Sequence, residues 1–194
     1  MPRAPSYAPR IVAPAAFVEE LAASRIGTTF NQYAEGPRAS LLRKRLTDYL
    51  ERRAAADVLL VGEAPSYRGA RVSGIPFTSE WQITKASPTE ATATIVHREL
   101  SELGLEERVL LWNVVPTHPG TASSNRPPTR SEVAAGLSFA LPLIAGRAVV
   151  PVGRTAERAL GVPGLRHPSH GGARGFRAGL IELRDRGALV PDPA

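Results

Sequence analysis

Short, continuous apolar runs alternate with longer amphipathic segments along most of this 194-residue chain. A continuous apolar run of this length is typical of a strand that is covered on both faces, as in a parallel sheet between helices. Four such strands are predicted, at 57–61, 108–115, 147–152 and 165–168.

The segments between the runs have the spacing of amphipathic helices. Thr129 and Glu132 form a capping-box pattern that marks one helix start. Helices are predicted at 15–25, 40–53, 92–103, 129–144, 154–160 and 172–187. This alternation predicts an α/β fold, a three-layer α/β/α sandwich with a central, mostly parallel four-stranded sheet.

The chain is predicted to form a single domain over residues 14–187. Residues 1–13 are basic and rich in proline, without the hydrophobic region of a signal peptide, so they are expected to be a flexible arm. Residues 188–194 are expected to be a polar tail. No apolar run approaches the roughly 18 residues that span a bilayer, so no membrane partner is expected.

The composition narrows the possible chemistry. The chain has no cysteine, which excludes disulfides, thiolate metal sites and a cysteine-bound iron–sulfur cluster, and which fits a cytoplasmic location. The formal net charge of +6 favours a phosphate-rich partner such as nucleic acid.

Unusual residues follow three of the predicted strands. In parallel sheets, ligands bind beyond the carboxyl ends of the strands, so these segments are expected to meet at one edge. None of them contains a P-loop or a G-x-G-x-x-G fingerprint, which argues against the common nucleotide cofactors. The segments are GEAP at 62–65, N at 113 with PTHPGTASSNRPPT at 116–129, and RHPSHGG at 166–172.

Together these segments resemble the motifs of the uracil-DNA glycosylase superfamily. GEAP with the later GIPF at 74–77 is similar to the GEAPG and GRPF elements of the iron–sulfur branch. NVV at 113–115 and NRPPT at 125–129 resemble two further elements of that branch, and HPS at 167–169 matches a motif near the C-terminus of several branches. The resemblance extends from about residue 58 to 175. The chain departs from the iron–sulfur branch because it lacks the four cluster cysteines.

The resemblance implies an enzyme that flips uracil out of DNA and hydrolyses its N-glycosidic bond, leaving an abasic site. Phe77 would stack on the base, although a core position is the alternative. Asn113 would read the base, because an amide matches the adjacent N3–H donor and O4 acceptor of uracil; alternatively it ties down a strand end. His167 would donate to the negative charge that develops at O2, with His118 and His170 as rivals for this role.

The remaining pocket assignments are less direct. Glu63 is a candidate to orient the attacking water, but backbone carbonyls could do so instead. Gly62 would allow the backbone to approach the base closely, and Ala64 offers no side chain where another branch has a catalytic Asp. Ser66 or Tyr67 would block the methyl group of thymine.

DNA is the expected partner, and basic or small residues on the same loops are expected to contact it. Arg174 is also a candidate to fill the gap left by the flipped base. The predicted DNA contacts are Arg68, Arg71, Arg126, Ser169, His170 and Arg174.

The expected protein is a monomer that needs no cofactor and no metal. Two alternatives to uracil excision stay open: excision of other deaminated bases such as hypoxanthine or xanthine, and low-turnover binding of damaged or abasic DNA.

Overall fold

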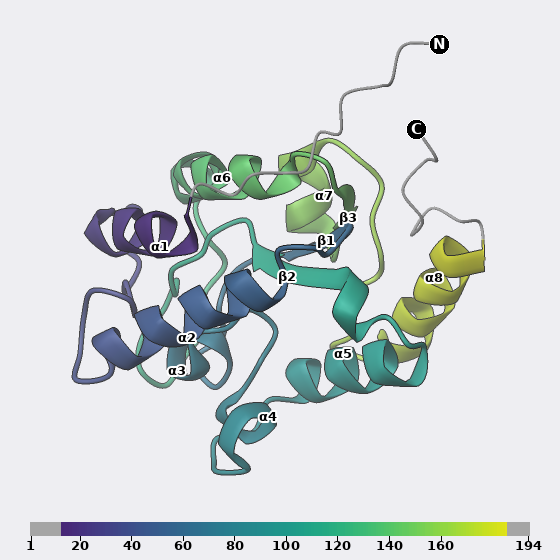
Figure 1. Cartoon of the computed structure of the whole chain (residues 1–194), viewed down its shortest axis with the longest axis horizontal. Coiled ribbons are helices and arrows are strands. Elements are labelled where there is room, and N and C mark those ends of the chain that lie inside the picture. Colours follow the sequence, from purple (N-terminus) through teal and green to yellow (C-terminus); the bar gives the residue numbers. More distant parts are fainter. Residues whose placement is uncertain (1–12, 186–194) are drawn as a thin grey trace.

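The computed structural model describes residues 13–185 and shows an α/β fold (Figure 1). The predicted arm at 1–13, apart from Ala13, and the predicted tail at 188–194 lie outside these residues. The elements are α1 (Pro14–Ala23), α2 (Ala39–Arg52), β1 (Val58–Gly62), α3 (Ala70–Ser73), α4 (Glu80–Thr84), α5 (Ala91–Glu102), a 3-10 turn (Glu106–Arg108), β2 (Val109–Asn113), α6 (Arg130–Ile144), β3 (Ala148–Pro151), α7 (Arg154–Leu160) and α8 (Ala173–Asp185).

The three strands form a parallel sheet in the order β2-β1-β3. Every residue of β1 and β2 is buried, as their continuous apolar sequences predict. Gly62 pairs in register with Asn113, so the two strands end side by side. The segments that follow β1 and β2 therefore begin at the same edge of the sheet.

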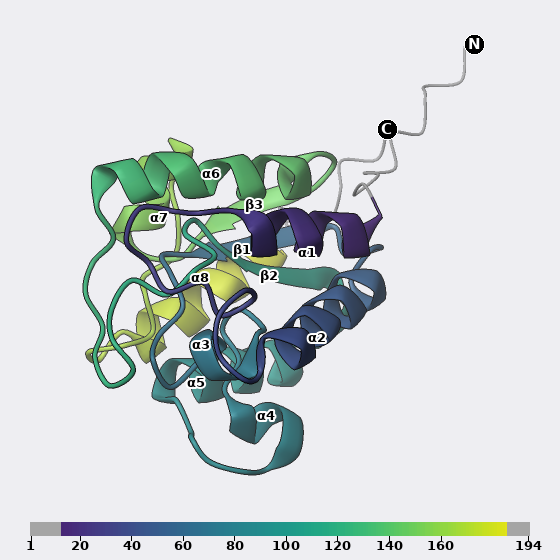
Figure 2. The ribbon, with the colours of Figure 1, turned by 90° about the vertical axis from the view of Figure 1, so that its left-hand side faces the viewer.

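Helices cover both faces of the sheet (Figure 2). Helices α6 and α7 lie over one face, and α2, α5 and α8 lie over the other (Figures 1 and 2). Helix α1 packs beside β2 and α6. The centre of the Phe17 ring lies 5.6 Å from that of Trp112 in β2 and 5.9 Å from that of Phe139 in α6. The predicted layered arrangement is confirmed.

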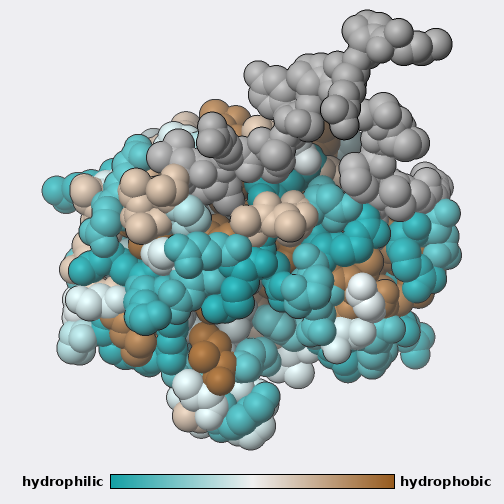
Figure 3. Space-filling view, in the orientation of Figure 1, coloured by the Kyte–Doolittle hydropathy of each residue, from teal (hydrophilic) through white to brown (hydrophobic). Residues whose placement is uncertain are grey.

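The surface view in Figure 3 is mostly hydrophilic, with apolar residues in small separate groups. Within residues 13–185, no helix has both the length and the apolar character needed to cross a membrane.

The prediction of a fourth strand at 165–168 was wrong. Leu165 makes a single parallel bridge to Val152, with its N–H 2.7 Å from the carbonyl oxygen of Pro151. The ladder ends there, because the segment that pairs with Leu165 leaves the strand after Val152 and begins helix α7 at Arg154. The bridge nevertheless brings the segment that contains His167 to the same edge of the sheet as the ends of β1 and β2.

Two short helices, α3 and α4, lie in a region where the sequence predicted no helix or strand. Helix α4 begins with a capping box formed by Ser79 and Gln82. Its first residue, Glu80, is buried and receives hydrogen bonds from Arg38 at 2.9 Å and from Arg45 at 2.9 and 3.0 Å. These guanidinium groups, Arg45 above all, lower the pKa of Glu80 to about 2. Helix α4 is thus attached to α2 by charge pairing.

The predicted capping box of α6 is confirmed and extends into a buried network. Glu132 accepts from the Thr129 N–H at 2.8 Å and from both terminal nitrogens of Arg126 at 2.7 Å. It also accepts from the Thr28 N–H at 3.2 Å. Arg126 is the main reason that the pKa of Glu132 is lowered to about 2. The network joins the segment before α6 to the turn after α1.

We expect the Glu132→Gln variant to unfold with a free energy about 2 kcal/mol lower at neutral pH, because Arg126 and the backbone N–H groups lose hydrogen bonds to a charged acceptor. The lowered pKa means that the unfolded chain binds protons first as the pH falls. The contribution of Glu132 is therefore complete above about pH 4.5 and is lost as the pH falls toward about 2. Urea unfolding across this range measures both effects. An equally steep acid dependence in the variant and in the parent would contradict this assignment.

Candidate active site

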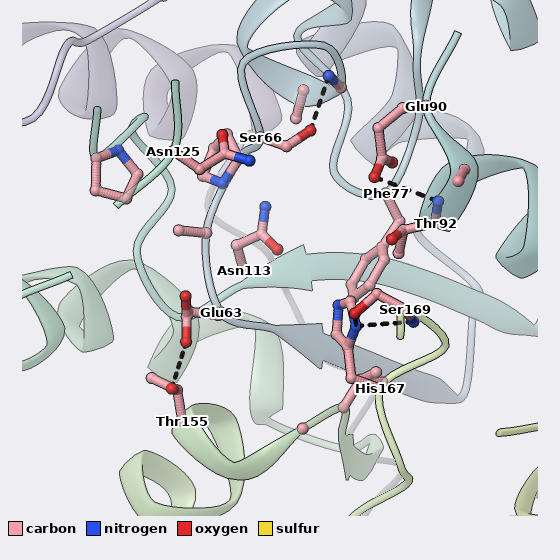
Figure 4. Close-up of a pocket in the computed structure, with 18 of the residues that line it drawn as sticks. Glu63, Ser66, Phe77, Glu90, Thr92, Asn113, Asn125, Thr155, His167 and Ser169 are labelled. Atoms are coloured by element: carbon pink, nitrogen blue, oxygen red, sulfur yellow. Dashed lines mark hydrogen bonds between the residues drawn. The ribbon is translucent and has the colours of Figure 1, made fainter. Parts of the chain in front are cut away.

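A cavity of about 600 Å³ opens at the carboxyl edge of the sheet (Figure 4). Its walls come from the loops after β1, β2 and β3, from the residues around Phe77 and the start of α5, and from the segment around His167. Its lining comprises Glu63, Ala64, Pro65, Ser66, Gly69, Ala70, Phe77, Glu90, Ala91, Thr92, Asn113, Pro119, Asn125, Arg126, Val152, Gly153, Arg154, Thr155, His167, Ser169 and His170. The cavity therefore brings together Phe77, Asn113, His167 and Glu63.

Gly62 lies behind the cavity wall, beneath Phe77 and Asn113. A Cβ atom on Gly62 would be 2.4 Å from Cζ of Phe77 and 2.9 Å from Oδ1 of Asn113. Only glycine leaves room for both side chains. Phe77 itself has φ of 53°, a strained value for a residue with a side chain, which is a feature that clusters at functional sites. The backbone therefore holds this ring against the end of β1.

Asn113 is the last residue of β2 and is 3% exposed. Its side-chain amide makes no hydrogen bond to any residue between 13 and 185, although it borders the cavity. No contact supports the alternative that it ties down the strand end. The amide thus presents an unused donor and an unused acceptor to whatever enters the cavity.

His167 is half-buried and is oriented by Ser169. Its Nδ1 lies 3.2 Å from the N–H of Ser169 and 2.7 Å from the Ser169 hydroxyl. Because a backbone N–H can only donate, Nδ1 is the acceptor, and the neutral ring carries its proton on Nε2. Burial lowers the pKa of His167, while the negative charges of Glu90 and Glu63 oppose this shift. The ring is therefore a neutral N–H donor at neutral pH.

Glu63 follows β1 and is held by Thr155 at the start of α7. The Thr155 hydroxyl donates a hydrogen bond to Oε2 of Glu63 (Figure 4). Oε1 makes no hydrogen bond to the described residues. One oxygen is therefore fixed while the other stays available beside the cavity.

Three of the lining residues that were not predicted make side-chain hydrogen bonds. Glu90 accepts from the N–H groups of Thr92 and Ala93, at 3.3 and 2.8 Å, as the N-cap of α5. Asn125 accepts from the Tyr67 N–H at 2.9 Å, which joins the loop after β1 to the loop after β2. Thr155 holds Glu63 as described. The sequence offered one signal for each of the first two: Glu90 precedes a predicted helix, and Asn125 begins the NRPPT segment.

Ser66, like Ala64, lines the cavity. Its hydroxyl accepts from the Gly69 N–H at 2.9 Å, which closes the turn between β1 and α3. The neighbouring Tyr67 does not line the cavity and packs against Arg68, whose guanidinium carbon lies 5.3 Å from the ring centre. Of the two residues proposed to exclude a methyl group, Ser66 is the one at the cavity.

The other two histidine candidates have different surroundings. His170 is exposed at the cavity edge, with Nδ1 2.9 Å from the Ser169 hydroxyl. His118 is fully buried and does not line the cavity; both of its ring nitrogens contact backbone carbonyl oxygens. Of the three histidines, only His167 is both half-buried and at the cavity.

The predicted DNA contacts differ in whether the side chain already has a partner within the protein. Arg126 donates to Glu132 through both terminal nitrogens, and the Ser169 hydroxyl bonds to the His167 ring. Both side chains therefore already have partners within the protein. Arg71 is half-buried, with its guanidinium 4.6 Å from the Phe30 ring centre. Arg68, Arg71, Arg154 and Arg174 are among the arginines that have no carboxylate partner within residues 13–185. Arg154, which was not predicted, lines the cavity.

The sequence model of the Uracil DNA glycosylase superfamily matches residues 51–183. The chain belongs to this superfamily. The matched range contains every lining residue of the cavity. Membership supports a DNA glycosylase, a hydrolase of DNA repair.

Comparison with solved structures supports the superfamily fold. The crystal structure of SMUG2 from Pedobacter heparinus is similar, with a TM-score of 0.64 at 12% sequence identity; the match covers 91% of this chain and 98% of that chain. At this identity the likeness concerns the fold alone. No curated protein matches the chain.

Proposed function

We propose that this superfamily member is a monofunctional uracil-DNA glycosylase, which extrudes uracil from DNA into the cavity and hydrolyses its N-glycosidic bond. The observation that carries the proposal is the uncommitted amide of Asn113, which lies beside the Phe77 ring in the same cavity as the N–H of His167. An amide whose oxygen faces N3–H and whose NH2 group faces O4 matches uracil, whereas cytosine would need the opposite amide orientation.

In the proposed reaction, the bond between N1 of uracil and C1′ of deoxyribose breaks, and the electron pair leaves with the base. The Nε2–H of His167 donates to the negative charge that accumulates at O2. Water attacks C1′, its oxygen forms the new bond, and Glu63 accepts its proton through the oxygen that Thr155 leaves free. The uracil anion then takes up a proton on release, so the products are free uracil and an abasic site.

The unpaired arginines support DNA as the ligand. Arg68, Arg154 and Arg174 belong to three segments that border or flank the cavity, and none has a carboxylate partner between residues 13 and 185. Unpaired guanidinium groups at such an edge suit phosphates of a DNA backbone. Arg126 would act mainly by holding its loop through Glu132.

A release assay on a panel of duplexes tests the proposal. Each duplex carries one uracil opposite A or G, or one hypoxanthine, xanthine, thymine or cytosine, with EDTA present. We expect free uracil and an alkali-labile abasic site, with no product from thymine or cytosine. Binding of the uracil duplex without any base release would contradict the proposal.

The cavity volume favours one second candidate. The whole cleft of about 600 Å³ is larger than a single pyrimidine, so its total volume does not restrict it to uracil and a deaminated purine is the second candidate. Faster release of hypoxanthine or xanthine than of uracil in the same panel would identify that activity.

Thr155→Val is expected to lower the rate at saturating DNA about tenfold, because Glu63 loses the hydrogen bond that orients it. The concentration of DNA at half-maximal rate should change little, since the hydrogen bond that is lost is made to Glu63. Thr94→Val, at an exposed position on α5, is the matched control. An unchanged rate for Thr155→Val would show that Glu63 needs no such support.

A further inference from the structure

His118 lies in the loop after β2 and is held from all sides. Its side chain is fully buried. Its backbone N–H lies 3.0 Å from the carbonyl oxygen of Phe30 and 3.2 Å from Oε1 of Gln32, and its own carbonyl accepts from the Phe30 N–H at 2.9 Å. These bonds fix the backbone from which the ring projects.

Both ring nitrogens of His118 face carbonyl oxygens. Nδ1 is 2.8 Å from the oxygen of Pro65, and Nε2 is 2.9 Å from the oxygen of Thr121. A carbonyl oxygen can only accept, so each contact needs a proton on the nitrogen. A neutral imidazole has only one N–H. Its other ring nitrogen would then direct a lone pair at a carbonyl oxygen in a buried site, where two acceptors in contact are unfavourable.

The two carbonyls belong to different walls of the cavity. Pro65 follows Glu63 and Ala64 in the loop after β1, and all three residues line the cavity. Thr121 belongs to the loop after β2, in which Pro119 and Asn125 line the cavity. The ring of His118 is thus a bridge behind the wall, between the loop that carries Glu63 and the loop that follows Asn113.

We propose that His118 is a positioning residue whose ring is protonated on both nitrogens, and that this double donor fixes the two loops so that Glu63 and Asn113 face one bound base. The role in catalysis rests on the function proposed above. The protonation of the ring and the tie between the loops do not.

Nitrogen-15 NMR of histidine-labelled protein at neutral pH tests the protonation. We expect the His118 ring to show two nitrogens that each carry a proton, assigned by the loss of these signals in His118→Gln. His97 is the internal control: it is half-buried, and burial lowers its pKa, so its ring should show one protonated nitrogen. A neutral pattern for His118, with one bare nitrogen, would overturn the proposal.

Amide hydrogen exchange tests the tie between the loops independently of any activity. Glutamine can donate to one of the two carbonyls and leucine to neither, so exchange in segments 64–69 and 119–126 should rise by about tenfold in His118→Gln and more in His118→Leu. The sheet strands should keep their protection, as should the whole His97→Gln control. Equal protection of both segments in His118→Gln, His118→Leu and the parent would overturn the tie.

The effect on turnover completes the test. A displaced loop should lower the rate at saturating uracil-DNA by about 10²-fold in His118→Leu, with DNA affinity nearly unchanged. Full activity in this variant would overturn the catalytic part. If the parent protein releases no uracil, the proposed function fails, while the NMR and exchange results still decide the protonation and the tie.

Discussion

Replacing His167 by alanine should lower the rate of uracil release by about 10²–10³-fold, which is the usual cost of one donor to a developing negative charge. The expected loss follows from the geometry of the ring. The Ser169 N–H occupies Nδ1, so the only N–H of the neutral ring is at Nε2, and the ring lines the cavity. Alanine removes this donor and leaves the backbone of the segment in place.

The fold of the His167→Ala variant should survive, because the ring is only half-buried and bonds mainly to its neighbour Ser169. Single-turnover release of uracil measures the rate, and thermal unfolding checks the fold. His97→Ala is the matched control, since His97 is half-buried but does not line the cavity. A His167→Ala rate within a few-fold of the parent rate would remove His167 from the mechanism.

Adding one methyl group at Gly62 should be nearly as damaging, with a loss of about 10²-fold in the rate. The new Cβ would lie 2.4 Å from the Phe77 ring and 2.9 Å from the Asn113 amide oxygen, so neither side chain could keep its position. The residue proposed to stack on the base and the residue proposed to read it would move together.

The Gly62→Ala result is measured by comparing rates on uracil-containing DNA with free energies of unfolding. The rate should fall much further than the stability, because the displaced ring borders a cavity into which it can move. Gly175→Ala in α8 is a suitable control, since its Cβ would meet only the flexible side chain of Arg166, at 3.1 Å. Normal turnover by Gly62→Ala would contradict the close packing of Phe77 and Asn113 at this point.

The sheet could be predicted from the sequence because a strand covered on both faces needs a continuous run of apolar residues. Strands β1, β2 and β3 coincide with continuous apolar runs. The fourth run failed because the segment that it pairs with turns into α7 at Arg154, which ends the ladder after one bridge. Helix α4 was missed because it is short, and because its first residue, Glu80, pairs with two distant arginines, Arg45 in α2 and Arg38 just before α2.

The candidate site could be predicted where a motif coincides with a strand end. Asn113 ends β2, Glu63 follows β1, and His167 follows the bridge at Leu165. Thr155 could not be predicted, because its place beside the cavity depends on how α7 packs against the sheet. The sequence places Glu90 before a helix, but its position at the cavity depends on how α5 packs against the sheet. The pairing of Arg126 with Glu132, likewise, comes from the buried network at the start of α6 and not from the NRPPT pattern itself.

The most direct test of the proposed recognition is a crystal structure of the His167→Ala variant with a DNA duplex that contains one uracil. We predict that the uracil lies outside the base stack and inside the cavity, with its ring against Phe77 and its N3 and O4 atoms within hydrogen-bond distance of the Asn113 amide. A uracil that stays stacked in the duplex, or that binds without contact to Phe77 and Asn113, would contradict the account.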